Sequence, residues 1–255
     1  MSKAILIVGV AGSGKTWTAY TLYEWFASEK QDVVVLNLDP GVDNVPYTPV
    51  FDIRDYVDLW RVMNEYRLGP NGGLIVSMDL MLNHLEKINS VLRSIGNSLA
   101  IIDTPGQLEV FLYRPSGKLI IDSLDVEELV IIYIVDAVFV KDIRNLVASM
   151  MLGGTLKLKF QKPLITILNK IDLIDKEELN TILKLSKKPI LLKKYADKYL
   201  DTFESDFIYH ISRLMRRYGV FTEMVPVSSL YMTNYESLIG LLTRILFGGE
   251  EYYSI

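Results

Sequence analysis

The chain has 255 residues, of which half are hydrophobic and 23% are charged, and its net charge is −4. This composition is that of a folded globular protein and excludes disorder over most of the length, while the small net charge excludes an overall field that would draw the protein onto nucleic acid or an anionic membrane. With no cysteine, the chain has no disulfide or thiolate metal site, which agrees with a reducing compartment. We therefore expect a cytoplasmic protein with a single domain over residues 1–255.

Short apolar runs rich in β-branched residues predict buried strands. They occupy residues 4–8, 33–36, 99–102, 129–135, 164–168 and 224–227. Each run is continuous rather than alternating, as expected where helices cover both faces of a sheet, and longer helical patterns lie between the runs. The prediction is an α/β fold with a doubly wound, mainly parallel sheet. Gly12, Ser13 and Lys15 cut the first run far short of a signal peptide or membrane span, so no membrane association is expected.

Two segments between predicted strands are too long for simple connections, and we expect both to carry inserted helices. They are about residues 51–96 and about residues 175–219. The first contains Gly69-Pro70-Asn71-Gly72-Gly73, which has the composition of a turn, because proline fixes one backbone angle and Asn71-Gly72-Gly73 tolerates left-handed conformations. Apolar residues at helical spacing precede and follow this stretch, so the turn is expected to join two helices.

A glycine-rich sequence follows the first predicted strand and precedes a helical pattern at 19–26. Residues 9–16 match the phosphate-loop pattern G-x-x-x-x-G-K-[ST], which ends in Lys15 and Thr16. Small residues let backbone N–H groups turn inward around phosphate oxygens, and the positive end of the next helix faces the same charge. In this arrangement Lys15 reaches the β and γ phosphates, and the Thr16 hydroxyl binds Mg²⁺. The alternative is a glycine-rich turn that binds no ligand. The predicted strand before the sequence and the predicted helix after it favour a phosphate loop instead.

An aspartate follows the predicted strand at 99–102, at the edge of the sheet where doubly wound folds bind ligands. Asp103 begins a D-x-x-G pattern that ends at Gly106. Asp103 is expected to hold magnesium through water, while the Gly106 N–H meets the γ phosphate and responds to its loss. Gln107 and Glu109 come next and have the chemistry to orient an attacking water. From the residues alone, they are equally well explained as ordinary members of a helix first turn.

The pattern N-K-x-D at residues 169–172 follows the predicted strand at 164–168 and favours guanine. The Asp172 carboxylate can accept hydrogen bonds from guanine N1–H and the 2-amino group, whereas adenine has an acceptor at N1 and no 2-amino group. A site built on such bonds can discriminate by factors of about 10⁴ to 10⁵. Asn169 is expected to brace the loop and the base, and the stem of Lys170 to cover the base plane. Ser228-Ser229 follows the last strand, where a backbone N–H can meet guanine O6, although this pair alone is too common to identify a site.

In this order, the motifs resemble those of the GPN-loop GTPases, a family within the dimeric branch of phosphate-loop NTPases, and in particular its archaeal-type homodimeric members. The resemblance runs from residue 4 to about residue 246. Beyond the motifs above it includes Leu38-Asp39-Pro40-Gly41 after the second strand, the Gly69-Pro70-Asn71 loop and Val227-Ser228-Ser229. One departure is Gly41, where the family usually has alanine, and the smaller residue is expected to loosen this loop.

The resemblance implies a homodimeric, Mg²⁺-dependent GTPase that binds GTP and GDP. In the family, the Gly-Pro-Asn loop of one subunit enters the nucleotide site of the other, so Asn71 would act in trans on the γ phosphate, as an arginine finger does elsewhere. By the same resemblance, Asp39, Gln107 and Glu109 position the water, and Asp39 joins Thr16 and Asp103 near the metal. The implied nucleotide contacts are Gly12, Ser13, Gly14, Lys15, Thr16, Trp17, Gly106, Asn169, Lys170, Asp172, Ser228 and Ser229.

Three functions remain open at this point. The first is a GTP-hydrolysing switch, and the second is a nucleotide-dependent assembly factor or chaperone whose own turnover is negligible. Eukaryotic relatives are associated with RNA polymerase assembly, so the resemblance implies a protein client such as RNA polymerase or its assembly factors, without direct contact to nucleic acid. The third is a small-molecule kinase, in which the pattern at residues 169–172 has no expected place.

Overall fold

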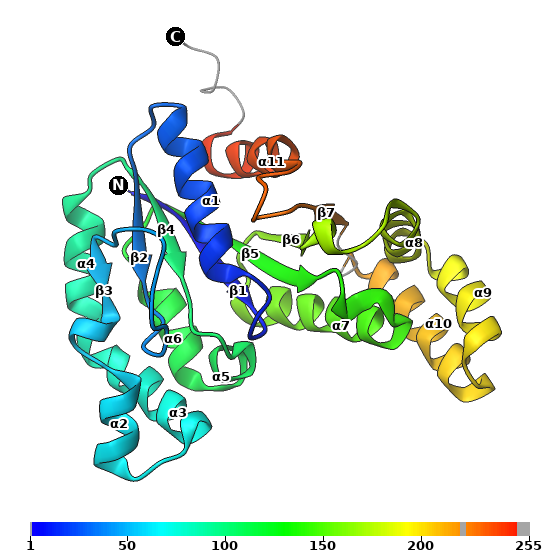
Figure 1. The fold of residues 1–255 in the computed structure, drawn as a ribbon, viewed down its shortest axis with the longest axis horizontal. Coiled ribbons are helices and arrows are strands. Elements are labelled where there is room, and N and C mark those ends of the chain that lie inside the picture. The colour runs from blue at the N-terminus through cyan, green and yellow to red at the C-terminus, as the bar shows by residue number, and fades with distance from the viewer. Residues whose placement is uncertain (1, 220–222, 249–255) are drawn as a thin grey trace. The chain divides into compact units, whose positions relative to one another are not determined.

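The computed structural model of the protein describes residues 2–219 and 223–248 (Figure 1). These described residues divide into two compact units, one formed by residues 2–132 and 242–248 and the other by those within Tyr133–Leu241. Strand β5 (Glu128–Asp136) runs from the first unit into the second. The strands form a seven-stranded sheet in the order β3-β2-β4-β1-β5-β6-β7, which confirms the predicted α/β class.

Parallel strands form the centre of the first unit. They are β1 (Lys3–Gly9), β2 (Val33–Asn37), β3 (Phe51–Asp52) and β4 (Leu99–Asp103). β4 lies between β1 and β2, and Lys3 and Val33 are both opposite Leu99. Residues 4–8 and all of β4 are buried, which explains their continuous apolar sequence. Because the strands are parallel, the loops after β1, β2 and β4 all leave the same edge of the sheet.

All six predicted strands are present, and the sequence missed β3. This strand has two residues and pairs only Phe51 with Leu36 and Asp52 with Asn37. Such a short element carries no detectable period, so a pattern of hydrophobic residues cannot reveal it.

Helices of the first unit lie on both faces of its strands. They are α1 (Lys15–Ser28), α2 (Leu59–Tyr66), α3 (Pro70–Met81), α4 (Leu85–Ser94), α5 (Leu108–Tyr113) and α6 (Pro115–Ser123). Figure 1 shows α1 in front of these strands and α6 behind them, as right-handed connections require. The short helices α5 and α6 approach very closely, since a Cβ added at Gly117 would lie 1.8 Å from the Phe111 carbonyl oxygen.

The Gly-Pro-Asn stretch joins α2 to α3, as predicted, and its last residues belong to α3. The left-handed residue is Arg67 (φ 53°), directly after α2, whereas Gly69 is extended (φ −73°, ψ 172°) and precedes the first turn of α3. Pro70 begins the helix, because its fixed φ suits the first helical position and its missing N–H is not needed there. Asn71, Gly72 and Gly73 tolerate left-handed conformations, but in the structure they are helical.

The second unit combines two strands with a group of helices. Its elements after β5 are α7 (Ile143–Phe160), β6 (Leu164–Asn169), α8 (Lys176–Lys187), α9 (Pro189–Tyr199), α10 (Thr202–Arg217), β7 (Met224–Pro226) and most of α11 (Tyr235–Phe247). β6 and β7 are parallel, with Thr166 opposite Met224. Helix α8 begins with a capping box in which Asp175 and Glu178 satisfy each other's backbone N–H groups.

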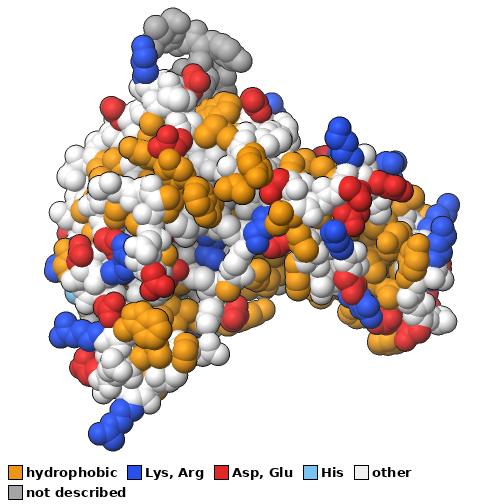
Figure 2. Space-filling model, in the orientation of Figure 1, with side chains coloured by type: hydrophobic (Ala, Val, Ile, Leu, Met, Phe, Trp, Pro, Cys, Tyr) orange, Lys and Arg blue, Asp and Glu red, His pale blue; other side chains and the backbone are white. Residues whose placement is uncertain are grey.

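The hydropathy of the described helices and the charges on one face of the molecule agree with the composition. Among the helices in residues 2–219 and 223–248, none is both long and apolar enough to cross a bilayer. Figure 2 shows basic and acidic side chains interspersed over the face in view, in keeping with the small net charge.

Candidate functional site

The phosphate loop of the first unit has the backbone that its glycines predict. Gly12 (φ 75°) and Gly14 (φ 99°) both adopt left-handed conformations that strain other residues. Gly14 directly precedes α1, so the loop delivers the chain to the N-terminus of a helix that begins at Lys15. Backbone N–H groups at such a helix start favour an anion such as phosphate.

Lys15 crosses the loop and joins it to the segment after β4. Its Nζ donates to the carbonyl oxygens of Gly9 (3.0 Å), Val10 (3.2 Å) and Gly106 (3.4 Å). Burial lowers the pKa of Lys15, and the negative charges of nearby carboxylates, among them Glu109, oppose that shift. The ammonium group thus lies in a buried, negatively charged setting, where an additional anionic ligand would compensate for its lost hydration.

Asp103 is a fully buried carboxyl group at the end of β4. Its Oδ2 accepts a hydrogen bond of 2.8 Å from the hydroxyl of Tyr47, and its Oδ1 has no hydrogen-bond partner among the described residues. Burial raises the pKa of Asp103 to about 6, and the hydroxyls of Tyr47 and Thr16 oppose the rise. A buried oxygen without a donor is costly, so this arrangement fits a bound cation.

The donor set around Asp103 suits magnesium. Mg²⁺ prefers oxygen ligands and usually combines one or two carboxylates with phosphate oxygens and water. Thr16 and Asp103 provide a hydroxyl and a carboxylate of this kind, and Asp39 adds a negative charge close by. In the part of the chain that the structure describes, no group of three or more acidic or histidine side chains could hold a metal ion by itself.

Asp39 is held in place by the residues around it. Asn37 accepts from the Asp39 N–H (3.0 Å) and donates to its carbonyl oxygen (3.3 Å), while the Asp39 carboxylate accepts from the Gly41 N–H (2.9 Å). Burial raises the pKa of Asp39, and the N–H groups of Gly41 and Gly106 oppose the rise. A Cβ added at Gly41 would lie 2.7 Å from Cδ2 of Leu59, so Leu59 fills the space that an alanine at position 41 would need.

Two of the predicted catalytic residues contact each other within one chain. Gln107 Nε2 donates to Asn71 Oδ1 at 2.8 Å, which joins the start of α3 to the residue before α5. An ion pair of 3.0 Å between Arg114, directly after α5, and Asp79 forms a second contact to α3.

Trp17, which is predicted to contact nucleotide, is half exposed on α1 and packs edge-on against Tyr20.

The residues predicted for the base lie together in the second unit. Asn169, at the end of β6, is buried, and its Oδ1 accepts from the Ser229 N–H (3.0 Å) and the Ser229 hydroxyl (2.9 Å). The buried hydroxyl of Tyr235 donates in turn to Ser229 Oγ at 2.9 Å. The loop after β7 is therefore fixed to the loop after β6 through side chains.

Asp172 and Lys170 are oriented by neighbours from the same unit. Ser228 Oγ donates to Asp172 Oδ1 at 2.5 Å, so the carboxylate expected to read guanine is held by the loop after β7. Lys170 has a left-handed backbone (φ 65°), and its Nζ forms an ion pair of 2.7 Å with Asp136 at the end of β5. This pair fixes the direction of the Lys170 stem.

Several residues of these sites have no signal in the sequence. Tyr47 and Asn37 support the carboxylates of the first unit, and Tyr235 and Asp136 support the base loops of the second. None of these four residues is part of a sequence motif with a characteristic spacing. Tyrosine and asparagine are common in loops and strand ends, so only their contacts reveal what they do.

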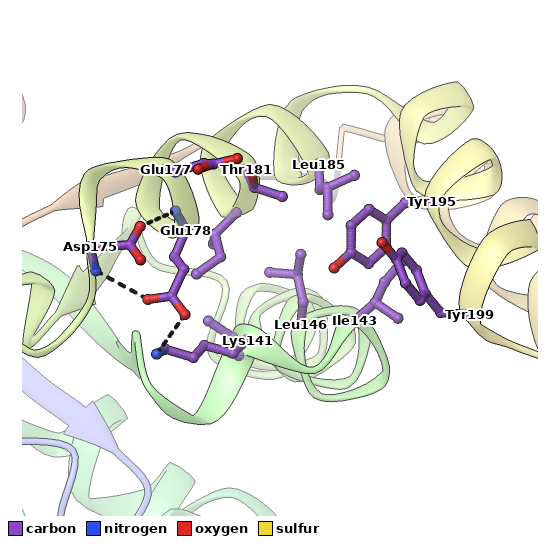
Figure 3. Close-up of a pocket in the computed structure, with 12 residues that line it drawn as sticks. Lys141, Ile143, Leu146, Asp175, Glu177, Glu178, Thr181, Leu185, Tyr195 and Tyr199 are labelled. Atoms are coloured by element: carbon purple, nitrogen blue, oxygen red, sulfur yellow. Dashed lines mark hydrogen bonds and ion pairs between the residues drawn. The ribbon is translucent and has the colours of Figure 1, made fainter.

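A separate hollow of about 320 Å³ lies in the second unit, among residues 140–199 (Figure 3). At one end, Glu178 pairs with Lys141 (2.8 Å) and closes the capping box with Asp175. At the other end, Tyr195 and Tyr199 face each other with ring centroids 4.8 Å apart. None of the predicted site residues lines this hollow.

Comparison with known proteins identifies the family to which these sites belong. A family model described as "Conserved hypothetical ATP binding protein" matches residues 7–247. GPN-loop GTPase 3 of Mycosarcoma maydis is 30% identical over 201 residues, which cover 78% of this chain and 70% of that protein. The chain belongs to the GPN-loop GTPase family. This confirms the resemblance inferred from the motifs.

Further GPN-loop GTPase relatives agree in sequence and in fold. GPN-loop GTPase 1 of Schizosaccharomyces pombe is 37% identical over 177 residues, or 68% of this chain and 48% of that protein. The chain thus spans about half the length of this relative. The crystal structure of PAB0955, a GTPase in apo form from Pyrococcus abyssi, has a TM-score of 0.83 and 27% identity, covering 95% of this chain and 97% of that one.

Proposed function

We propose that this GPN-loop GTPase binds GTP with Mg²⁺ and hydrolyses it to GDP and phosphate, as a cytoplasmic homodimeric switch. The observation that carries the proposal is the buried cluster of Lys15, Asp39 and Asp103 around a phosphate loop, in which one oxygen of Asp103 has no donor. Such a cluster is costly on its own and becomes favourable with a metal ion and phosphate.

Each residue of the cluster has a task in this reaction. Lys15 and the N–H groups of the phosphate loop bind the phosphate oxygens, and Thr16 and Asp103 hold Mg²⁺, which would neutralise charge on those oxygens. Asp39 and Glu109 are close enough to Lys15 to act on its pKa, which supports a role for these carboxylates in positioning a water nucleophile. Gln107 follows Gly106 and completes this group.

The base is proposed to be guanine, although the matching family model is described as ATP binding. Asp172 carries this choice, because Ser228 holds one oxygen of its carboxylate and adenine, unlike guanine, offers no N1–H or 2-amino donor to the carboxylate. Replacing Asp172 by asparagine is expected to weaken GTP binding and to favour xanthosine triphosphate, whose C2 carbonyl accepts from an amide. Competition between the two nucleotides measures this change, and an unchanged preference for GTP would contradict the assignment.

Completion of the site by a second subunit is proposed for Asn71. Its side chain is exposed at the start of α3, where a partner can reach it, and its carbonyl oxygen accepts from Gln107 of the same chain. On dimerisation, Asn71 reaches the γ phosphate bound by the partner subunit. Gln107 either stays hydrogen-bonded to Asn71 in this movement or is released from it. An action of Asn71 within its own chain through Gln107 is the second possibility that this contact favours.

Mixing two inactive variants separates action in trans from action within one chain. Lys15→Ala and Asn71→Ala are mixed, subunit exchange is verified with labelled chains, and GTP hydrolysis by the mixture is then measured. Action in trans gives one complete site in each mixed dimer, so roughly a quarter of the wild-type rate should return in a random 1:1 mixture. Action within one chain gives no recovery, because each chain then lacks a residue that its own site needs.

The biological role is proposed to be assembly of protein complexes, with a protein client such as RNA polymerase or its assembly factors. The alternative is an assembly factor with negligible turnover of its own. Phosphate release by the purified protein with GTP, without partners, distinguishes the two, and the Lys15→Ala variant is the control for contaminating activity. Transfer of phosphate to a small acceptor instead of water would indicate a kinase.

A further inference from the structure

Tyr47 connects a loop of the first unit to the buried carboxylate of Asp103. It lies in the segment between β2 and β3, and its hydroxyl donates to Asp103 Oδ2 at 2.8 Å. Both side chains are buried, and Tyr47 is 7% exposed. Burial is the largest cause of the raised pKa of Tyr47, so the phenol keeps its proton at neutral pH and acts as the donor in this bond.

The hydrogen bond gives the two oxygens of Asp103 different roles. A carboxylate is planar, so a donor that fixes Oδ2 also fixes the direction in which Oδ1 points. Oδ1 is the buried oxygen without a hydrogen-bond partner in the described part of the chain, and the Thr16 hydroxyl acts on the same carboxyl group. Tyr47 therefore leaves one oxygen for a cation and holds the other.

The loop that carries Tyr47 is fixed at its beginning by Arg54. The guanidinium of Arg54 donates to the carbonyl oxygens of Val42 and Asp43, both at 2.9 Å, and is itself held by Asp52 at 2.6 Å. Asp52 also accepts from Asn37, the residue that orients the backbone of Asp39. Tyr47 thus reaches Asp103 from a loop with defined attachments rather than from a free segment.

We propose that Tyr47 is a positioning residue for the metal site, which acts through Asp103 and sets how tightly Mg²⁺ joins the bound nucleotide. This inference rests on the proposed function, because it requires Asp103 to hold Mg²⁺. Residues that orient a metal ligand from behind typically contribute 10- to 100-fold to metal affinity. A tyrosine that merely fills space would affect folding and leave the metal response unchanged.

The test uses Tyr47→Phe, which removes the hydroxyl and keeps the ring. Tyr66→Phe is the matched control, since Tyr66 is an exposed tyrosine on α2. For each protein, the affinity for fluorescent mant-GDP is measured first in EDTA and then over a series of Mg²⁺ concentrations. For Tyr47→Phe we expect the affinity in EDTA to stay within twofold of wild type and the Mg²⁺ concentration at the midpoint to rise by about tenfold or more.

The outcomes distinguish this inference from the proposed function. A Mg²⁺ midpoint equal to that of wild type in folded Tyr47→Phe overturns the role of Tyr47, and so does an equal loss of affinity with and without Mg²⁺. If wild type itself shows no Mg²⁺ response, the proposed metal dependence fails instead. Where Tyr47→Phe does not fold, Tyr47→Met also removes the donor and keeps a large apolar side chain, and its Mg²⁺ midpoint is expected to rise in the same way. A midpoint equal to that of wild type overturns the inference here too.

Discussion

Replacing Asp103 by asparagine is expected to stabilise the protein when metal and nucleotide are absent. Asparagine keeps the shape of the side chain and an oxygen that can accept from Tyr47, but it removes the buried negative charge. The substitution also removes the carboxylate that is proposed to hold Mg²⁺. In the same variant, Mg²⁺ should therefore no longer increase the affinity for nucleotide. Sites that bind charged ligands are commonly less stable than the fold allows.

The size of the effect follows from the pKa of Asp103. Burial raises it to about 6 in the folded protein from an ordinary value of 3.8. The folded state therefore binds the proton more tightly than the unfolded state, and stability falls as the pH rises from about 4 to about 6, by about 3 kcal/mol in all. The Asp103 charge also supports the buried ammonium of Lys15, and its loss offsets part of the gain. We expect a net stabilisation of about 1–3 kcal/mol at pH 8 and little difference near pH 4.

Urea unfolding in EDTA at pH 5, 6, 7 and 8 measures this prediction. The difference in free energy of unfolding between Asp103→Asn and wild type should grow with pH up to about 7 and then level off. Asp122→Asn is the control, because Asp122 is an exposed carboxylate paired with Lys118, and its loss should cost about 0.5 kcal/mol or less. If Asp103→Asn is less stable than wild type at pH 8, the charge of Asp103 is net stabilising and the reasoning is wrong.

Three further substitutions test the packing, a helix start and the base loop. Gly117→Ala would put a methyl group 1.8 Å from a backbone oxygen, so it should lower the free energy of unfolding by about 2 kcal/mol or more. The control is Gly240→Ala, in open space on α11, which should raise the free energy of unfolding by about 0.5–1 kcal/mol. Equal thermal midpoints of the two variants would contradict this prediction. Asp175→Ala removes the capping box of α8 and should cost about 1 kcal/mol in urea unfolding, so no loss would refute a stabilising cap. Tyr235→Phe removes the donor to Ser229 and should weaken mant-GDP binding about fivefold; unchanged binding would show that this hydroxyl does not support the base loop.

The sequence determined the phosphate loop because its chemistry is local. Gly12 and Gly14 have the positive φ angles that few other residues adopt, and Lys15 begins a helix directly after them. Strand, glycines and helix are contiguous, so one short stretch specifies both the backbone and the anion-binding site. The continuous apolar runs likewise predicted all the strands of three or more residues, since burial on both faces of a parallel sheet leaves a clear pattern.

The contacts that complete the sites were decided by the tertiary structure alone. Tyr47 meets Asp103 across 56 residues of sequence, and Asn71 meets Gln107 across 36. No spacing rule joins such pairs, because the sheet order and the loop paths bring them together. The sequence thus determined which residues are candidates for the nucleotide site. Only the fold revealed which neighbours orient their side chains, since orientation depends on contacts between segments that are distant in the chain.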